Sequence, residues 1–346
     1  MNLADLNKVA LAMVTPGKGL LAADESSGTI KKRFDAIKVD STEDNRRDYR
    51  EMLFRSQEAM SKYISGVILY DETIWQNAKD GTPLVKLIEQ AGAIPGIKVD
   101  EGTQALPNCP GELVTVGLDK LAERLKKYYD RGARFAKWRA VIDIGSGAGS
   151  RGIPTMTAIR VNAHALARYA ALCQAAQIVP IVEPEVLMDG DHDIDRCYEV
   201  TQRVLNRTFQ ELRVQRVALE GMILKPNMAI SGKKCPKQAP VQEVAEKTIR
   251  LLKSCVPAAV PGIAFLSGGQ SDEEATAHLD AMNKIGNLPW KLTFSYGRAL
   301  QAAPQQAWSG KPDNVPAGQR AFSHRARMNG LASTGNWEAG LEKQAA

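Results

Sequence analysis

Short apolar runs recur along most of the chain. Each is four to six residues long and rich in Ile, Val, Leu or Phe, which is typical of strands buried on both faces. The eight predicted strands are Gly19–Ala23, Gly66–Tyr70, Ile94–Val99, Arg134–Trp138, Val179–Val182, Leu219–Leu224, Gly262–Leu266 and Trp290–Phe294.

Amphipathic stretches of helical period separate most of these runs. In one of them Ile159, Ala163 and Leu166 fall on the same face, and in another Thr42 supplies an N-cap residue. The predicted helices are Glu43–Met60, Asp119–Asp130, Thr157–Gln177, Ile194–Glu211 and Val241–Leu252.

Strand–helix units in parallel connection, repeated eight times, predict an α/β fold, a single-domain (β/α)8 TIM barrel over residues 1–310. The alternative is an open doubly wound sheet, but no linker separates two halves of the chain. The composition changes after residue 310, where prolines, glycines and alanines accumulate. We expect residues 311–346 to form a C-terminal helix, Gly318–Leu331, and a mobile tail.

The composition of the chain indicates which kinds of molecule the protein is expected to bind. The chain has 346 residues, of which 44% are hydrophobic and 24% charged, and a net charge of +6 that indicates anionic partners. No basic run is interleaved with aromatic residues, so a small phosphorylated molecule is favoured over nucleic acid. Five cysteines without a C-x-x-C pair, and the absence of an apolar stretch of membrane length, predict a cytoplasmic protein that does not contact membranes.

Lys225 follows the apolar run Leu219–Leu224 and precedes Pro226, which holds it out of the α region. Burial disfavours the charged form of an ammonium group. A neutral amine attacks carbonyl carbons, so Lys225 is a candidate Schiff-base former. The plainer interpretation is a lysine that only marks where a strand meets water.

Residues capable of chemistry stand at the end of every predicted strand, where the site of a TIM barrel forms. In chain order they are Asp24; Asp71; Lys98 and Asp100; Lys137 and Arg139; Glu183 and Glu185; Lys225; Ser267, Gly268 and Gly269; and Ser295, Gly297 and Arg298. Glu183 and Glu185 point to the same side of a strand, and two close carboxylates favour one protonated acid for general acid–base catalysis. The lysines and arginines would give the cavity a positively charged entrance, which suits a substrate with two phosphates. Backbone N–H groups of the glycines can approach a phosphate closely.

No metal site is predicted, because the four histidines are far apart and Asp191-His192-Asp193 stands in a polar segment expected to be a solvated loop. The stretch Gly147–Gly152 matches G-x-G-x-x-G, but no acidic residue stands between 153 and 182 to hold a ribose. Dinucleotide binding is therefore not predicted.

With these residues in place, the chain from about residue 10 to 310 resembles the class I (Schiff-base) fructose-1,6-bisphosphate aldolases. The motifs that carry the resemblance are Leu21–Ser26, Gly96–Asp100, Phe135–Arg139, Val182–Glu185, Leu224–Met228, Leu266–Ser271 and Phe294–Arg298. The resemblance implies reversible cleavage of fructose 1,6-bisphosphate to dihydroxyacetone phosphate and glyceraldehyde 3-phosphate. It further implies that no metal or other cofactor takes part and that the protein is a homotetramer.

The resemblance also implies residue roles. Lys225 would form the imine, Glu183 would transfer protons, Lys137 and Asp24 would hold substrate hydroxyls, and Glu185 would orient the lysines. The phosphate nearest the imine would be bound by Ser267, Gly268, Gly297 and Arg298, and the other by Lys98, Arg139, Ser26 and Arg33. Gly269, Ser295 and Thr29 would be further substrate-binding residues.

The chain departs from the family at several positions. Thr29 stands where members often carry serine, and Glu101 where many carry lysine. Many animal members end in a tyrosine that transfers protons at the enamine stage, whereas the last tyrosine here is Tyr296. Either the tail does not contribute, or another acid or water protonates the enamine.

Two alternatives follow from the same residues. One is an aldolase-like barrel used mainly as a phosphosugar-binding or interaction scaffold, which would not need the lysine–glutamate chemistry. The other is a Schiff-base aldolase that acts on sugars with one phosphate, which two separate basic clusters disfavour.

Overall fold

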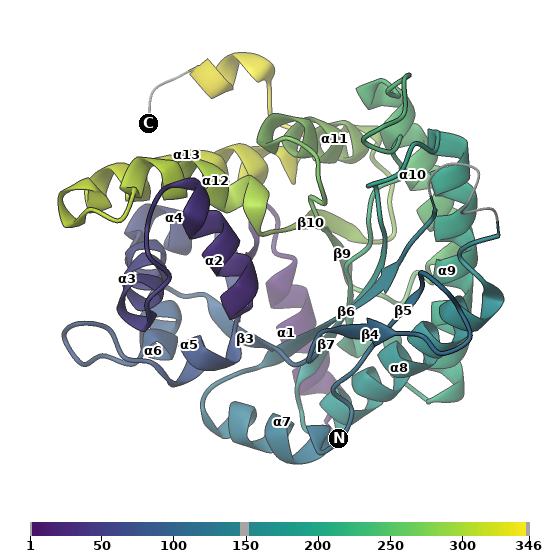
Figure 1. Ribbon diagram of the computed structural model, residues 1–346, viewed down its shortest axis with the longest axis horizontal. Helices are drawn as coiled ribbons and strands as arrows, with labels where there is room; N and C mark the ends of the chain where they lie inside the picture. The colour runs from purple at the N-terminus through teal and green to yellow at the C-terminus, as the bar shows by residue number, and fades with distance from the viewer. Residues whose placement is uncertain (1, 146–151, 344–346) are drawn as a thin grey trace.

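Eight parallel strands close into a barrel in the computed structural model, which describes residues 2–145 and 152–343 (Figure 1). The order around the barrel is β1-β10-β9-β8-β7-β6-β3-β2. The strands are β1 (Gly19–Ala23), β2 (Ile64–Leu69), β3 (Ile94–Lys98), β6 (Phe135–Ile142), β7 (Val179–Val186), β8 (Ile223–Leu224), β9 (Gly262–Phe265) and β10 (Lys291–Tyr296). The closed barrel predicted from the alternation of strands and helices is confirmed, and the open sheet is excluded.

Helices surround the barrel, and a short antiparallel hairpin of β4 (Thr103–Ala105) and β5 (Leu113–Thr115) lies outside it (Figure 1). The helices are α1 (Leu3–Met13), α2 (Ser27–Ala36), α3 (Glu43–Phe54), α4 (Gln57–Lys62), α5 (Asp71–Trp75), α6 (Leu84–Gln90), α7 (Leu121–Asp130), α8 (Met156–Ala175), α9 (Ile194–Val214), α10 (Val241–Cys255), α11 (Asp272–Ile285), α12 (Arg298–Trp308) and α13 (Val315–Ala332). Most of the motif Gly147–Gly152 lies outside the described residues.

Two predicted elements are corrected. The run Leu219–Leu224 is a strand only at Ile223–Leu224, because Leu219–Gly221 forms a turn of 3-10 helix. The Gln174 amide donates to the carbonyl oxygens at both ends of this turn, to Ala218 O at 2.7 Å and to Gly221 O at 3.2 Å. The predicted helix Glu43–Met60 is two helices. It breaks at Ser56, whose hydroxyl donates to Gln319 O at 3.3 Å on α13 rather than capping α4.

The barrel interior is packed at its amino end by side chains of α1 and of the strands. Leu6, Ala10 and Met13 of α1 pack against inward-facing residues such as Phe135 and Ile223. The Phe135 ring fills the space over Gly96, where a Cβ would lie 2.2 Å from it. A side chain at Gly96 would therefore displace the ring and the layer around it.

The predicted C-terminal helix is present as α13, which buries Phe322 and Ala326. Beyond it, the Trp337 N–H donates to Asp280 at 2.9 Å, and Glu342 pairs with Arg325. The mobility of the tail that follows this helix stays a prediction. No helix among the described residues is long and apolar enough to span a membrane.

Candidate active site

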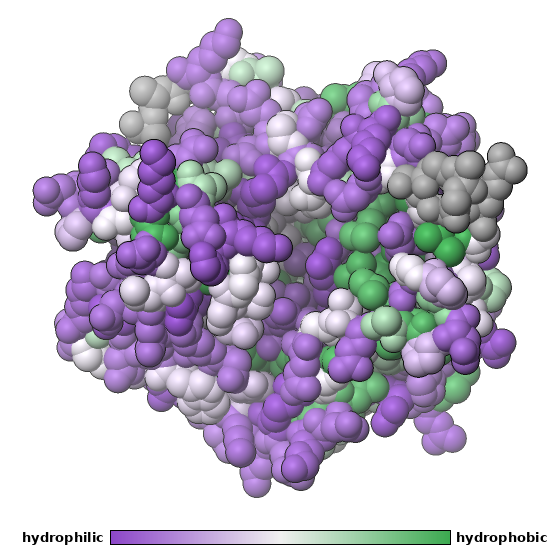
Figure 2. Space-filling model, in the orientation of Figure 1, coloured by the Kyte–Doolittle hydropathy of each residue, from purple (hydrophilic) through white to green (hydrophobic). Residues whose placement is uncertain are grey.

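A cavity of about 600 Å³ opens at the carboxyl ends of the strands. Figure 2 shows this face of the molecule hollowed near its centre, with hydrophilic side chains on most of the rim. All but one of the residues predicted for the site line the cavity: Asp24, Ser26, Thr29, Arg33, Lys98, Asp100, Lys137, Arg139, Glu183, Glu185, Lys225, Ser267, Gly268, Gly269, Ser295, Gly297 and Arg298. Asp71 does not contribute, because it begins α5 outside the cavity and accepts a hydrogen bond from Tyr128 at 2.7 Å.

Lys137 is the centre of a buried network of charges. Lys137 lies on β6, and its Nζ is 2.7 Å from Oδ2 of Asp24, the residue that follows β1. The same Nζ is 3.6 Å from both Asp100 Oδ2 and Glu183 Oε2. Asp100 in turn lies 3.5 Å from Lys98 Nζ. Three carboxylates thus face three lysines, Lys225 included, so the fully ionised cluster is neutral.

The network fixes the charge of two of its members. Burial alone would raise the pKa of Asp24, but Lys137 and Lys225 outweigh it and hold this pKa well below its usual range. Burial alone would lower the pKa of Lys137, but Asp24, Asp100 and Glu183 raise it well above its usual value. Asp24 therefore stays ionised and Lys137 protonated at any pH near neutrality, which suits them to binding rather than to proton transfer.

Lys225 follows β8 directly and its side chain is buried at the floor of the cavity. Its backbone N–H donates to Val182 O at 2.8 Å, which continues the pairing with β7. Its Nζ is 3.2 Å from Glu183 Oε1. A proton can pass between the two without changing the net charge of the cluster. The other oxygen, Glu183 Oε2, is buried without a hydrogen-bond partner among the described residues.

Glu183 and Glu185 both line the cavity from β7, as their spacing predicts. Each carboxylate nevertheless faces cations: Glu183 faces Lys137 and Lys225, and Glu185 accepts a hydrogen bond from Arg139 Nε. Burial would lower the pKa of Arg139, but Glu185 raises it well above its usual value, so the guanidinium stays charged.

One end of the cavity, between β9 and β10, presents donors without acceptors. Ser295 Oγ and Arg298 Nη2 are buried and have no hydrogen-bond partner among the described residues. Gly268 adopts φ +57°, a conformation that favours glycine, and turns the chain beneath the cavity. The Gly269 N–H, expected to face a phosphate, donates to Met188 Sδ at 2.8 Å. A thioether is a weak acceptor, so this N–H can exchange it for a phosphate oxygen.

Helix α2 supplies three lining residues, Ser26 and Thr29 at its amino end and Arg33 in its last turn. Ser26 caps the helix, and its hydroxyl is 3.1 Å from that of Thr29. Arg33 pairs with Glu25 and reaches toward β10, since a Cβ on Gly297 would lie 3.5 Å from Arg33 Nη2. Arg33 therefore lies beside the residues expected to bind the phosphate nearest the imine, and which phosphate it serves stays a prediction.

Several lining or supporting residues were not predicted. Met188 and Lys233 lie on loops beyond the strand ends, outside the positions that the strand pattern and the family motifs mark. Asn227 is buried and ties the segment after β8 to β7 and to α9: it accepts from Val186 N at 3.0 Å and donates to Thr201 Oγ1 at 3.0 Å. It stands in the motif Leu224–Met228, two residues after Lys225, but no role was predicted for it.

His192 corrects another expectation, because it is buried rather than solvated: the backbones of Gly190 and Gly232 pack around its ring. Burial lowers the pKa of His192, so its imidazole is neutral near pH 7. Among residues 2–145 and 152–343, no cluster of His, Cys, Asp and Glu is placed to hold a metal ion.

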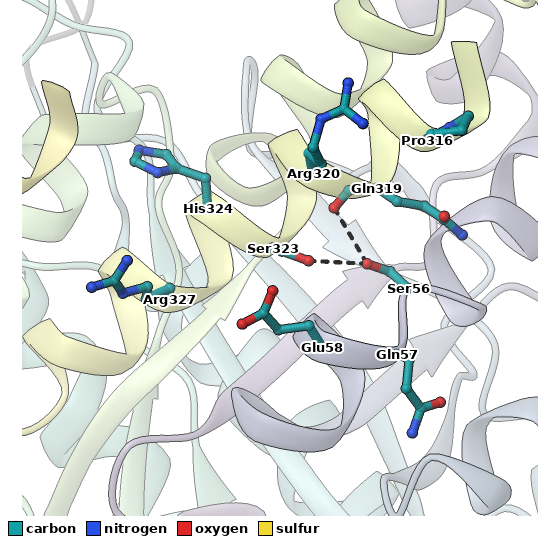
Figure 3. A pocket seen from close by; sticks show the side chains of 9 residues that line it. All are labelled: Ser56, Gln57, Glu58, Pro316, Gln319, Arg320, Ser323, His324 and Arg327. Carbon is teal, nitrogen blue, oxygen red and sulfur yellow. Dashed lines mark hydrogen bonds between the residues drawn. The ribbon is translucent and has the colours of Figure 1, made fainter. Parts of the chain in front are cut away.

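A second cavity, of about 440 Å³, lies between α4 and α13 on the outer ring of helices (Figure 3). Ser56 lies 3.2 Å from Ser323 on one wall, and Arg320, His324 and Arg327 extend from α13. It contains none of the predicted site residues. The cavity at the strand ends therefore remains the candidate active site.

Comparisons with known proteins agree with this assignment. Residues 5–346 match the family model described as fructose-bisphosphate aldolase class-I. The chain is 57% identical over 339 residues to a probable fructose-bisphosphate aldolase class 1 of Xanthomonas campestris, covering 98% of this chain and 100% of that one. It is 53% identical to fructose-bisphosphate aldolase 1 of Toxoplasma gondii, with 97% and 92% covered.

Among solved structures, a fructose-bisphosphate aldolase from Plasmodium falciparum, crystallised with TRAP and a small-molecule inhibitor, superposes with a TM-score of 0.94. The two chains are 48% identical, and the match covers 98% of this chain and 96% of that one.

Proposed function

The chain belongs to the class-I fructose-bisphosphate aldolase family, and we propose that it cleaves fructose 1,6-bisphosphate through an imine formed on Lys225. The observation that carries this proposal is the buried contact of 3.2 Å between Lys225 Nζ and Glu183 Oε1. It joins a nucleophile to a group that can accept and return its proton. The scaffold alternative is not favoured, because a barrel that only bound phosphosugars would not need this pair.

The neutral Lys225 amine attacks the C2 carbonyl of the open-chain ketose, and a tetrahedral carbinolamine forms. Glu183, holding the proton taken from Lys225, returns it to the C2 hydroxyl, which leaves as water. The protonated imine then draws electrons from the C3–C4 bond. Glu183, now a carboxylate, takes the proton of the C4 hydroxyl as this bond breaks, which releases glyceraldehyde 3-phosphate and leaves an enamine. Glu183 or water then protonates the enamine at C3, and water hydrolyses the resulting imine, which releases dihydroxyacetone phosphate and restores the Lys225 amine.

The fixed charges of Asp24 and Lys137 suit binding roles. An ionised Asp24 accepts hydrogen bonds from substrate hydroxyls and stabilises the positive charge of the imine. A protonated Lys137 donates to substrate oxygens on the opposite side. Arg139, held by Glu185, keeps its Nη atoms for the outer phosphate together with Lys98.

The phosphate nearest the imine is proposed to bind between β9 and β10. Ser295 Oγ and Arg298 Nη2, buried without partners among the described residues, supply donors there, and Ser267, Gly268, Gly269 and Gly297 complete the turn. The preference for a bisphosphate over a monophosphate stays a proposal, supported by cations at both ends of the cavity.

Kinetics of Lys225→Arg test the chemistry. The variant keeps a positive charge but cannot form the imine, so cleavage is expected to fall by at least about a thousandfold. Substrate binding, measured by calorimetry, is expected to persist. Near-native cleavage by this variant would refute the proposal. Wild-type activity is expected to survive excess EDTA.

A homotetramer in the cytoplasm is proposed from the family resemblance. Five free cysteines support a reducing compartment. Light scattering of the purified protein tests the oligomeric state, and a monomer would contradict the proposal.

A further inference from the structure

Lys233 lies on the rim of the cavity, over the turn Ser267–Gly269. It belongs to the loop between β8 and α10, and its Nζ is 2.7 Å from Asp189 Oδ1, on the loop after β7. Its side chain crosses the turn closely, since a Cβ on Gly269 would lie 1.8 Å from Lys233 Cε. Any side chain at position 269 would therefore displace the lysine.

The backbone of this loop is held by hydrogen bonds, whereas the Lys233 side chain is held by an exposed ion pair. Three hydrogen bonds join the two loops: Gly232 N to His192 O at 2.8 Å, Lys233 N to Met188 O at 2.8 Å, and Lys234 N to Gly190 O at 3.0 Å. The Lys233 and Asp189 side chains are 45% and 62% exposed. An ion pair as exposed as this one contributes little stability, so the ammonium group can leave Asp189 at small cost.

The turn beneath Lys233 has donors that lack a strong acceptor. Among the described residues, the Gly269 N–H is held only by the Met188 thioether. Beside the turn, at the start of α12, Arg298 Nη1 lies at a distant 3.5 Å from Asp272 Oδ1. A phosphate dianion offers strong acceptor oxygens. One bound on this turn would attract the ammonium group more strongly than the single charge of Asp189 does.

We infer that Lys233 is a further substrate-binding residue. When substrate binds, its ammonium group moves away from Asp189 and contacts the phosphate bound at Ser267–Gly269. The inference rests on the proposed function for the nature of the ligand, the phosphate end of a ketose. Lys233 takes no part in the ion pairs around Lys225. It therefore acts on KM and leaves kcat nearly unchanged.

The test uses hexitol 1,6-bisphosphate, which lacks a carbonyl and cannot form an imine, titrated into the full-length protein by calorimetry. Lys233→Met is expected to weaken binding by about 5–20-fold, the usual loss of a charge-assisted contact. The matched control is Lys234→Met, which removes a neighbouring exposed lysine that does not line the cavity. It is expected to change binding by less than about twofold.

The substitution Asp189→Asn tests whether Lys233 binds the phosphate or only stabilises the loop. Releasing Lys233 should tighten binding by about two- to fivefold, and most of this gain should vanish when Lys233→Met is also present. Equal losses in Lys233→Met and Lys234→Met, or weaker binding in Asp189→Asn, would overturn the inference. Because the probe forms no imine, failure of the proposed chemistry would appear in cleavage assays and not in this titration.

Discussion

Replacement of Lys137 by methionine tests the buried charge network most sharply. The substitution removes the cation that lies 2.7 Å from Asp24 and 3.6 Å from Asp100 and Glu183, and changes the cluster from neutral to a net charge of −1. Removing one partner from a buried ion pair costs about 3–5 kcal/mol, because a charge is left uncompensated. We therefore expect Lys137→Met to lower the free energy of unfolding by about this amount at pH 8.

The loss should depend on pH with a definite sign. In the wild type, the lowered pKa of Asp24 gives stability that is present above its unfolded pKa of about 3.9 and lost only as pH falls below that value. This contribution is therefore constant between pH 8 and pH 5. In the variant, one carboxylate of the cluster takes up a proton to relieve the excess charge. This carboxylate binds the proton more tightly in the folded state than in the unfolded state. The loss of unfolding free energy caused by Lys137→Met is therefore smaller at pH 5 than at pH 8, by about 1–3 kcal/mol.

Urea unfolding followed by tryptophan fluorescence at pH 8 and pH 5 measures both effects. Lys234→Met is the matched control and should change stability by less than about 0.5 kcal/mol. Asp24→Asn combined with Lys137→Met restores neutrality and should recover at least half of the loss. A loss below about 1 kcal/mol, or one that is equal at the two pH values, would refute the reasoning.

Three further substitutions probe single contacts. Glu183→Gln should lower kcat by about 10²–10⁴-fold in a coupled cleavage assay because the proton carrier is lost; a decrease below about tenfold would contradict its role. Ser295→Ala should raise KM about fivefold while the unfolding midpoint stays equal or rises, since the hydroxyl has no partner among the described residues; an unchanged KM would remove Ser295 from the site. Asn227→Ala should cost about 1–3 kcal/mol and lower kcat, because it breaks the hydrogen bonds that tie the segment after Lys225 to β7 and α9; a stability equal to that of the wild type would contradict this tie.

The barrel could be predicted because its strands are short, apolar and buried on both faces, so that each stands out between amphipathic helices. The predicted ends of strands and helices were wrong where tertiary contacts override the local sequence pattern. Leu219–Gly221 is apolar enough for a strand, but hydrogen bonds from Gln174 hold it in a helical turn. Ser56 breaks a periodic helix because its hydroxyl bonds to α13, more than 250 residues later.

The floor of the site could be predicted from the same pattern, because the residues after parallel strands converge at one end of a barrel. Lys225, Glu183, Lys137 and Asp24 come together for that reason. Met188 and Lys233 could not be found in this way, since the paths of the loops after β7 and β8 depend on hydrogen bonds between residues far apart in the chain. Met188 and Lys233 come to lie over Gly269 only when these loops have folded.

Borohydride trapping tests the central claim most directly. The protein is incubated with fructose 1,6-bisphosphate in excess EDTA, reduced, digested and mapped by mass spectrometry. An imine on Lys225 predicts a reduced substrate adduct on the peptide that contains this lysine, and none in Lys225→Arg. An adduct on another lysine, or cleavage in EDTA without any adduct, would contradict the mechanism.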